Sequence, residues 1–453
     1  MSIERAVLDF IDDLQGLNMH GFLLSLHGET LAEGYWRPFS AQRPHRLYSV
    51  SKSAVSLAIG LLADDGALSL DAPIVAFFPE WADGASEALR AVTIRHMLTM
   101  STCYDRAQYV PLQDEDWTRP FFFGKPTHPA GTLFSYDTSA SQVLGALVER
   151  LTGRSVLSIL EERLFAPLGM TGEKKWLKDG RGTSQGGTGL IMTLRDFSKL
   201  ANFCMSDGRG LISASYLREA TACQIGTGER SGPEERYGYG YQFWRMRRGF
   251  WMYGLGGQLA LCLPEKGLSL CTTADLILDA PGVQSVIDAF FRRLERVDEM
   301  AHDEADAAAL QRRLDGLSCE PLSFAQAAPR DVRVKIERSA LAFDALAVTD
   351  TCVQFRVDGR TYALPYGNGH WAGAVFPTTQ EPCMCSGGWR SADRFELLCR
   401  LTGDAICSMR LFLSTNADWA AVRVVGSLGE LAGGWSGLAW GVISESAERG
   451  LRP

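Results

Sequence analysis

The hydrophobic pattern of the chain changes near residue 298. Before that position, apolar residues recur mainly every three or four positions, which is typical of helices packed on a core. The segment 20–37 differs, because the runs GFLLSL and LAEGYW flank the turn signal HGET and predict a β-hairpin. The pattern further predicts helices over 49–64, 93–100, 136–152, 155–167, 194–206 and 282–297, and strands over 237–244 and 251–275.

After residue 330, apolar and polar residues alternate with period two, which indicates strands with one buried face. The pairs Asp358-Gly359 and Gly403-Asp404 interrupt this alternation and are typical of hairpin turns. The intervening range 298–319 is charged, rich in alanine and predicted to be helical. We therefore predict a first domain over 1–297, a helical connector over 298–319, and an all-β domain over 320–453 that forms a small barrel or sandwich.

Composition and charge narrow the function classes. The 453 residues carry a formal net charge of −8 at pH 7, whereas nucleic-acid-binding proteins need a basic surface. The first residues include Glu4, Asp9 and Asp12, which is incompatible with the basic and then apolar start of a secretory signal. No apolar run approaches the roughly 18 residues of a membrane span. We expect a cytoplasmic protein that acts on small molecules, with neither nucleic acid nor membrane as its partner.

The cysteines and histidines give no metal signature. The eleven cysteines are odd in number and irregularly spaced, which favours buried reduced thiols over a disulfide framework. The pair Cys383 and Cys385 has no second CxxC or histidine partner, so we expect no zinc site there. The seven histidines lack metal spacing such as HExxH. The sequence therefore predicts an activity that needs no metal and no organic cofactor.

Ser49 and Lys52 form the first candidate catalytic pair. They stand three positions apart in Ser49-Val50-Ser51-Lys52, so on a helix they share a face. Free N–H groups at the start of that helix would favour negative charge developing near the serine. A lysine buried in the apolar run that follows would lose its charge easily and act as a base. The tetrad alone is a weak signal, since a surface lysine on an ordinary helix gives the same pattern.

Five ordered segments strengthen this interpretation. They are 47–81 with the Ser49 tetrad, 92–103, 129–172 with Tyr136, 186–203 with Gly186-Gly187, and 253–275 with Gly256-Gly257. In this order they resemble the corresponding segments of the serine β-lactamase and penicillin-binding-protein hydrolases, and the resemblance covers roughly residues 20–297. The branch it points to contains esterases, D-amino-acid peptidases and aminohexanoate-oligomer hydrolases. The resemblance implies an α+β fold of the β-lactamase type, in which helices flank an antiparallel sheet and a mostly helical lobe is inserted between about 66 and 185.

The second motif of that family is Tyr-x-Asn, and it matches Tyr136-Asp137-Thr138 here. The resemblance implies that the Tyr136 phenol passes protons between the nucleophile and the leaving group. A structural role beside Phe134 is the alternative reading of this tyrosine. Thr138 replaces the family's asparagine, which helps to hold the substrate amide, and we therefore doubt β-lactam processing. Thr138 still offers one hydrogen bond to a substrate.

The third motif of the family, Lys-Thr-Gly or His-Thr-Gly, matches a stretch that has no basic residue, Gly254-Leu255-Gly256-Gly257-Gln258. This loss argues against penicillin-like substrates and against peptides with a free C-terminal carboxylate. By analogy, a backbone N–H near Gly257 joins that of Ser49 as the oxyanion site, and a shift of one position would give this role to Gln258. A plain glycine bulge is the structural alternative.

Together these patterns predict a serine hydrolase that cleaves an ester or amide of a small substrate through an acyl-enzyme on Ser49. A D-amino-acid peptidase or amidase is the second reading. A non-catalytic binding protein on the same scaffold is the third, and the retention of Ser49, Lys52 and Tyr136 argues against it. The role of the all-β domain stays open between covering the site, homo-oligomerisation and stabilisation. For the aromatic residues of 104–130, walling the site and shielding a loop are equal readings.

Overall fold

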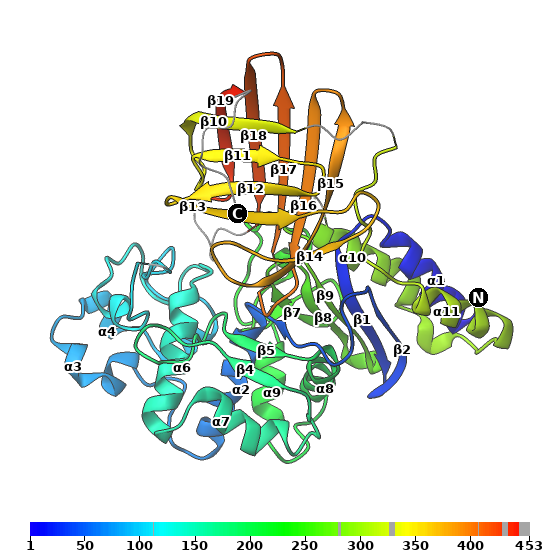
Figure 1. Ribbon diagram of the computed structural model, residues 1–453. Helices are drawn as coiled ribbons and strands as arrows, with labels where there is room; N and C mark the ends of the chain where they lie inside the picture. Colours follow the sequence, from blue (N-terminus) through cyan, green and yellow to red (C-terminus); the bar gives the residue numbers. More distant parts are fainter. Residues whose placement is uncertain (112, 280–281, 326–330, 406, 428–433, 444–453) are drawn as a thin grey trace. The chain divides into compact units, whose positions relative to one another are not determined.

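The computed structural model describes residues 1–111, 113–279, 282–325, 331–405, 407–427 and 434–443. The chain forms two compact units, Met1–Leu317 and Ser318–Pro453, and each has its own hydrophobic core (Figure 1). Residues 444–453 of the predicted C-terminal domain lie outside the described residues. The two units are described separately below.

An antiparallel sheet of six strands organises the first unit, in the order β2-β1-β9-β8-β7-β6. Side chains alternate between its two faces, so Phe22 and Leu24 of β1 enter one core and Leu23 enters the other. The strands are β1 (Met19–Leu26), β2 (Glu29–Tyr35), β6 (Trp244–Arg245), β7 (Phe250–Gly254), β8 (Gln258–Leu263) and β9 (Leu268–Ala274). The predicted hairpin is confirmed, and its turn His27-Gly28 has the positive φ angles that favour glycine at the second position.

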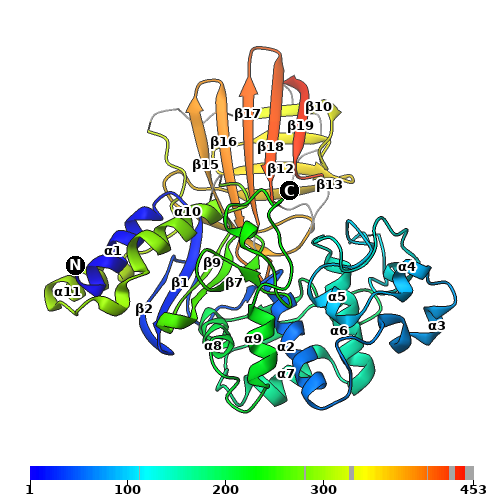
Figure 2. The ribbon, with the colours of Figure 1, turned by 180° about the vertical axis from the view of Figure 1, so that it is seen from behind.

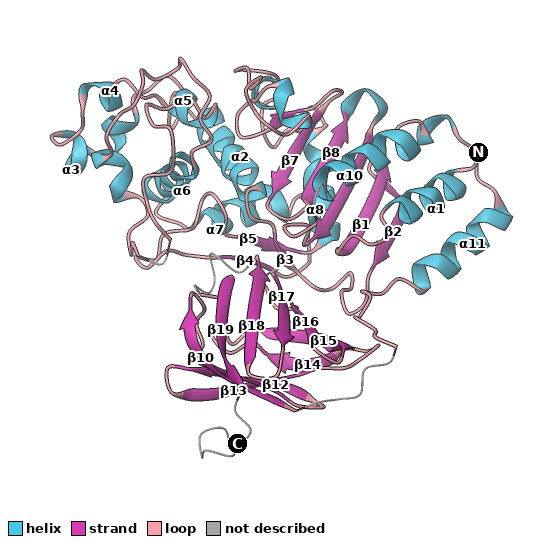
Figure 3. Ribbon diagram, turned by 90° about the horizontal axis from the view of Figure 1, so that it is seen from above, coloured by secondary structure: helices cyan, strands magenta, loops and turns pink. Residues whose placement is uncertain are grey.

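Helices cover both faces of this sheet. On one face lie α1 (Ile3–Asp13) and α10 (Gly282–Ala289), which Figure 3 shows crossing the strands. On the other lie α2 (Val50–Asp64) and α8 (Leu194–Cys204), and Figure 2 shows them on the side away from α10. Helix α11 (Glu304–Asp315) occupies the predicted connector range and packs against α1 and β2. The predicted α+β arrangement, a sheet flanked by helices, is confirmed.

A mostly helical lobe follows α2. Its helices α6 (Thr138–Thr152) and α7 (Val156–Leu160) pack against α2, and Gly153 ends α6 in the left-handed conformation. The short helices of the lobe are α3 (Pro79–Ala82), α4 (Glu87–Arg90) and α5 (Ile94–Leu98). The chain of the lobe returns through a small sheet, β3-β5-β4, whose strands are β3 (His45–Arg46), β4 (Lys174–Trp176) and β5 (Leu190–Met192). The sequence pattern predicted neither this sheet nor α9 (Ala214–Thr221).

The strand predicted over 237–244 is wrong for most of its length. Residues Glu234–Tyr237 form a 3-10 turn, and the first strand of the region, β6, begins only at Trp244. Gly238 and Gln242 have φ angles of 109° and 65°, which an extended strand does not allow. The alternation of tyrosine and glycine imitated a strand, although the backbone turns twice within it.

The second unit is a ten-stranded antiparallel sheet in the order β13-β12-β11-β10-β19-β18-β17-β16-β15-β14. Its end strands β13 and β14 contact each other, so the sheet is nearly closed into a barrel. The predicted turn Asp358-Gly359 joins β12 to β13. The strands are β10 (Val332–Ser339), β11 (Ala345–Val348), β12 (Cys352–Val357), β13 (Arg360–Pro365), β14 (Ala372–Val375), β15 (Pro382–Ser391), β16 (Arg394–Leu401), β17 (Ser408–Thr415), β18 (Trp419–Gly426) and β19 (Gly437–Ile443).

The cysteines are all free thiols, as the irregular spacing predicted. Cys223 is exposed and Cys352 is half-buried, whereas the other nine are buried. Within the described ranges, each helix is too short or too polar to cross a lipid bilayer.

Candidate active site

Ser49 lies at the start of α2, on a turn that the backbone holds in an uncommon shape. The preceding Tyr48 is buried and has a φ of 47°, a left-handed conformation that costs energy for a residue with a large side chain. The Ser51 hydroxyl fixes this turn, because it donates to the Tyr48 carbonyl at 2.6 Å and accepts from the Leu190 N–H at 2.9 Å. Ser49 itself is half-buried, so its hydroxyl stays at the edge of the core.

Lys52 reaches back along α2 to Ser49. Its Nζ donates to the Ser49 Oγ at 3.0 Å and to the Gly187 carbonyl at 2.9 Å. Only 1% of Lys52 is exposed, so its side chain reaches the half-buried Ser49 from within the core. Most residues of α2 are apolar and buried, and Lys52 is buried as well. The i, i+3 spacing places the Ser49 hydroxyl and the Lys52 Nζ on one face of the helix.

Tyr136 completes the group from the other side of Ser49. Its phenol hydrogen-bonds to the Ser49 hydroxyl, and its ring lies 5.0 Å from the Lys52 Nζ. The ring stacks on Trp244 with centroids 5.6 Å apart and an interplanar angle of 22°. Desolvation holds the pKa of Tyr136 above its usual range, while the Ser49 hydrogen bond lowers it. Tyr136 therefore stays a protonated phenol in the resting site and is available as a proton donor.

Asp137 follows Tyr136 and is fully buried at the N-cap of α6. One carboxylate oxygen accepts from the Ser139 N–H at 2.8 Å, and no hydrogen-bond partner for the other oxygen exists among the described residues. Desolvation raises the pKa of this carboxyl to about 6, against the lowering effect of the Ser139 hydrogen bonds and the charge of Lys52. Keeping the Asp137 carboxyl ionised therefore costs free energy in the folded protein.

Thr138 and Gly187 close the site beside Lys52. A Cβ atom added to Gly187 would lie 2.4 Å from the Thr138 methyl and 3.3 Å from the Lys52 Nζ. Any larger residue at position 187 would therefore push on the lysine. Thr138, the residue in place of the family asparagine, is half-buried and belongs to the first turn of α6.

The hairpin between β7 and β8 carries the third motif. A Cβ atom at Gly254 would lie 2.1 Å from the Leu47 carbonyl, so β7 approaches the Ser49 turn at backbone distance. The Gly257 N–H donates to the Gly254 carbonyl at 3.3 Å, within the turn. The Gln258 side chain is buried and donates to the carbonyls of Ala274 and Leu255. Its amide thus holds the hairpin, whereas the role of the Gly257 or Gln258 N–H toward substrate stays a prediction.

Three backbone N–H groups near the site are candidate donors to an oxyanion. Among the described residues, the backbone N–H groups of Ser49, Leu255 and Gly256 have no hydrogen-bond acceptor. Ser49 is one of the two predicted oxyanion donors. The other two belong to the same hairpin loop as Gly257, and glycine spacing alone does not show which N–H groups of such a loop are free.

A charged pair beside the tyrosine was also missed. Arg230 binds Glu235 at 2.7 Å, and its guanidinium lies 5.7 Å from the Trp244 ring centroid. Both charges act on Tyr136 and on Tyr253 of β7, since they shift the pKa of each phenol. The segment that contains Arg230 and Glu235 has neither hydrophobic periodicity nor a known motif. The sequence therefore does not predict that it lies near Tyr136.

Two of the aromatic residues of the long loop, Phe121 and Phe122, are buried in a hydrophobic core, and Tyr109 stacks on Trp117 with ring centroids 4.6 Å apart. Whether this loop walls the site stays a prediction. Tyr239 and Trp244, both buried, pack around Tyr136 and lie directly behind the motif.

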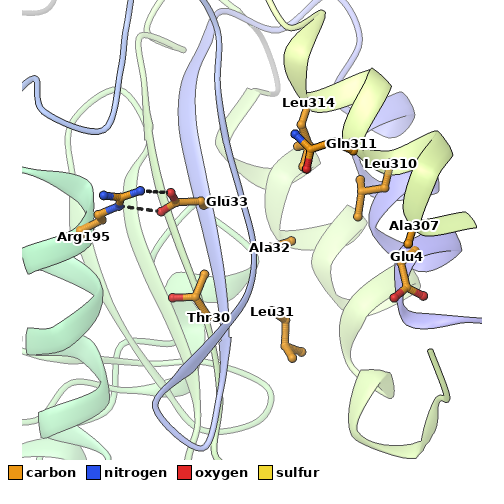
Figure 4. A pocket seen from close by; sticks show the side chains of 10 residues that line it. All are labelled: Glu4, Thr30, Leu31, Ala32, Glu33, Arg195, Ala307, Leu310, Gln311 and Leu314. Carbon is orange, nitrogen blue, oxygen red and sulfur yellow. Dashed lines mark hydrogen bonds and ion pairs between the residues drawn. The ribbon is translucent and has the colours of Figure 1, made fainter. Parts of the chain in front are cut away.

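A hollow of about 530 Å³ lies elsewhere in the first unit (Figure 4). The Glu33 carboxylate binds Arg195 at 2.9 Å at one side of it, and α11 forms the other side. None of the predicted catalytic residues lines this hollow, and we assign it no part in the chemistry of Ser49.

Known proteins share the fold and parts of the sequence. The β-lactamase family model matches residues 21–275. Esterase EstB of Burkholderia gladioli is 34% identical over 174 residues, which is 33% of this chain and 43% of the esterase. The 6-aminohexanoate-dimer hydrolase of Paenarthrobacter ureafaciens is 26% identical over 204 residues, 41% of this chain and 52% of that enzyme. The chain therefore aligns with about half the length of these relatives.

One solved structure resembles the whole chain. The octameric penicillin-binding-protein homologue from Pyrococcus abyssi covers 98% of this chain, and the chain covers all of it, with a TM-score of 0.50 and 14% identity. At this identity the likeness concerns the fold alone.

Proposed function

Because the chain belongs to the β-lactamase family, a hydrolase family with esterase and amidase-type members, we propose that it is a serine hydrolase acting through an acyl-enzyme on Ser49. One observation carries the proposal, the 3.0 Å contact between the Nζ of the buried Lys52 and the Oγ of the half-buried Ser49. A serine hydroxyl attacks a carbonyl only when a neighbour takes its proton, and here two candidate neighbours touch it.

In the proposed mechanism, Ser49 attacks the carbonyl carbon of an ester or amide. The Lys52 side chain, in its neutral amine form, takes the Ser49 proton as the bond forms. The Tyr136 phenol, hydrogen-bonded to Ser49, then protonates the leaving alcohol or amine when the ester C–O or amide C–N bond breaks, and the Lys52 ammonium returns a proton to the phenolate. Water hydrolyses the acyl-enzyme by the reverse route, with the same pair taking the proton from water and returning one to Ser49.

The oxyanion of each tetrahedral intermediate needs N–H donors. We assign one to Ser49, whose N–H lies at the start of α2, and the second to the loop 255–257 at the end of β7. The close approach of Gly254 to the Leu47 carbonyl supports this, because it brings that loop near the Ser49 turn.

Small uncharged esters are the substrates that the motifs support best. The third motif has no basic residue, and Arg230, whose charge acts on Tyr136, is paired with Glu235. Esterase EstB among the relatives agrees with this choice. An amidase or D-amino-acid peptidase is the second candidate, favoured by the relative named as a 6-aminohexanoate-dimer hydrolase. The octameric homologue makes self-association a further proposal for this chain, and a cytoplasmic location stays a prediction.

The test is covalent labelling with a fluorophosphonate, followed by intact-mass spectrometry and peptide mapping. We expect one adduct, on the peptide that contains Ser49, and hydrolysis of p-nitrophenyl acetate that the reagent abolishes. Ser49→Ala should lose both the adduct and the turnover.

Ser56→Ala is the matched control. It removes another buried hydroxyl from α2, one that binds the Tyr216 phenol and not the site. This variant should label like the wild type. Labelling of Ser49→Ala at an unchanged rate would refute the nucleophile. If the wild-type protein bound a small ester but showed neither labelling nor turnover, the result would favour the non-catalytic binding protein.

A further inference from the structure

Three cysteine thiols meet inside the barrel of the second unit. The sulfur atoms of Cys383, Cys385 and Cys399 lie within 4.8 Å of one another, and all three residues are buried. Cys383 and Cys385 are two positions apart on β15 and face the same way, while Cys399 is the register partner of Cys385 on β16. Strand pairing therefore unites residues that are separated in the sequence.

A thioether extends this group. Met409 of β17 is the register partner of Cys399, so Cys385, Cys399 and Met409 form one row across three neighbouring strands. Directly paired residues share a face of the sheet, and all four sulfur-bearing residues belong to the interior core of the barrel. The row offers sulfur ligands alone, since the cluster contains no histidine and no carboxylate among the described residues.

We infer that this four-residue sulfur cluster is a binding site for a soft monovalent metal ion, Cu(I), separate from the hydrolase site. A trigonal ion with metal–sulfur bonds of about 2.3 Å holds its sulfurs about 4 Å apart, which is within the observed spacing. Thiolate and thioether ligands together select Cu(I). Structural zinc is almost always tetrahedral with nitrogen or thiolate ligands, and the described residues supply only three.

Cu(I) binding to the cluster depends on pH and on the surrounding core. Each thiol that becomes a ligand releases its proton to solvent, so affinity for Cu(I) rises with pH. The surrounding core is apolar, with Phe376 and Leu397 fully buried in it, and it would protect the bound ion from water and from oxidation.

The experiment is an anaerobic titration of the reduced full-length protein with Cu(I), in competition with bicinchoninate. We expect one tightly held Cu(I) per chain and an ultraviolet sulfur-to-copper charge-transfer band. Cys399→Ala should weaken binding by roughly 100-fold or more, because even outer-shell partners of metal sites contribute 10–100-fold. Cys271→Ala, which removes a buried thiol of β9 outside the cluster, should bind as the wild type does.

Two further measurements keep the result decisive. Met409→Leu conserves volume and removes only the thioether, so it should weaken Cu(I) binding while leaving the circular dichroism spectrum unchanged. Thiol titration of the unfolded, metal-free protein should find all eleven cysteines. Two fewer thiols would mean a disulfide and overturn the metal site. Binding of Zn(II) in preference to Cu(I), or equal Cu(I) binding by Cys399→Ala, would also overturn it.

Discussion

Lys52 is the residue on which the proposed chemistry depends most. It is almost fully buried, and its Nζ donates to the Ser49 hydroxyl and to the Gly187 carbonyl. Lys52→Met keeps most of the side-chain volume and removes the group that accepts the serine proton. We expect kcat/KM for p-nitrophenyl acetate to fall by roughly 10³-fold or more, as for other members of catalytic units that act together.

Lys199→Met is the control for this change. Lys199 lies on α8, is partly exposed and pairs with Asp196 rather than with Ser49. Its variant should keep kcat/KM within about twofold of the wild type. Equal loss in both variants would point to general destabilisation, and full activity of Lys52→Met would remove the lysine from the mechanism.

Asp137 leads to a prediction about pH and stability. Folding raises the pKa of its carboxyl to about 6, above the unfolded value of about 3.9, so the folded state holds the proton more tightly. The corresponding stability is fully present below about pH 4 and is lost as the pH rises through about 6. The difference between the folded and unfolded pKa values corresponds to a loss of about 3 kcal/mol in the free energy of unfolding at neutral pH.

Asp137→Asn should therefore raise the free energy of unfolding at pH 7 by about 1–3 kcal/mol and change it little at pH 4. Urea unfolding at both pH values measures this. Asp65 provides a comparison of opposite sign, because its hydrogen bond with Arg163 lowers the pKa of that carboxyl. The stability that Asp65 contributes is present above its unfolded pKa and is lost as the pH falls. Asp65→Asn should therefore lower the free energy of unfolding at pH 7. A less stable Asp137→Asn at pH 7 would contradict the assignment.

At the scale of elements, the junction between β5 and α2 positions the nucleophile. Ser51 is not a nucleophile candidate, since no lysine follows it at i+3, yet its hydroxyl links the Tyr48 carbonyl to the Leu190 N–H. Ser51→Ala would leave that buried N–H without an acceptor, at a cost of about 1–3 kcal/mol. We expect lower stability and, because the Ser49 turn loosens, a reduced kcat with a nearly unchanged KM.

The measurement is steady-state kinetics together with thermal unfolding. Ser53→Ala is a useful comparison, because Ser53 also donates from α2 to a backbone carbonyl, that of Gln242. It should lower stability with a smaller effect on kcat. If Ser51→Ala lost stability but kept the kcat of the wild type, the Ser51 hydroxyl would have no positioning role.

The elements that the sequence predicted correctly are those with a strong local signal. Helix α2 and the β1–β2 hairpin follow from their apolar spacing and turn residues. Lys52 was found because its partner is three residues away on the same helix. Arg230 and Cys399 were not found, because only the folding of a long loop and the register of β15 with β16 place them beside their partners. Local patterns carry no information on such pairings.

On the scale of the whole molecule, the two units have separate cores. Leu261 is fully buried in the sheet of the first unit, and Leu397 is fully buried in the barrel. Each truncation to alanine should cost about 2–5 kcal/mol within its own unit. We expect calorimetry to show two unfolding transitions, with Leu261→Ala lowering the one that coincides with loss of esterase activity and Leu397→Ala lowering the other. A single transition shifted equally by both would show that the units unfold together.

The stack of Tyr136 on Trp244 also has an optical consequence. Trp244 is buried, and its indole lies 5.6 Å from the ring that hydrogen-bonds to Ser49. Indole emission responds to the charge and polarity of such close neighbours. The protein thus carries an intrinsic fluorophore next to the proposed nucleophile, and the difference between the wild type and Trp244→Phe would isolate its signal. Formation and decay of the acyl-enzyme could then be followed in real time on unlabelled, natural esters.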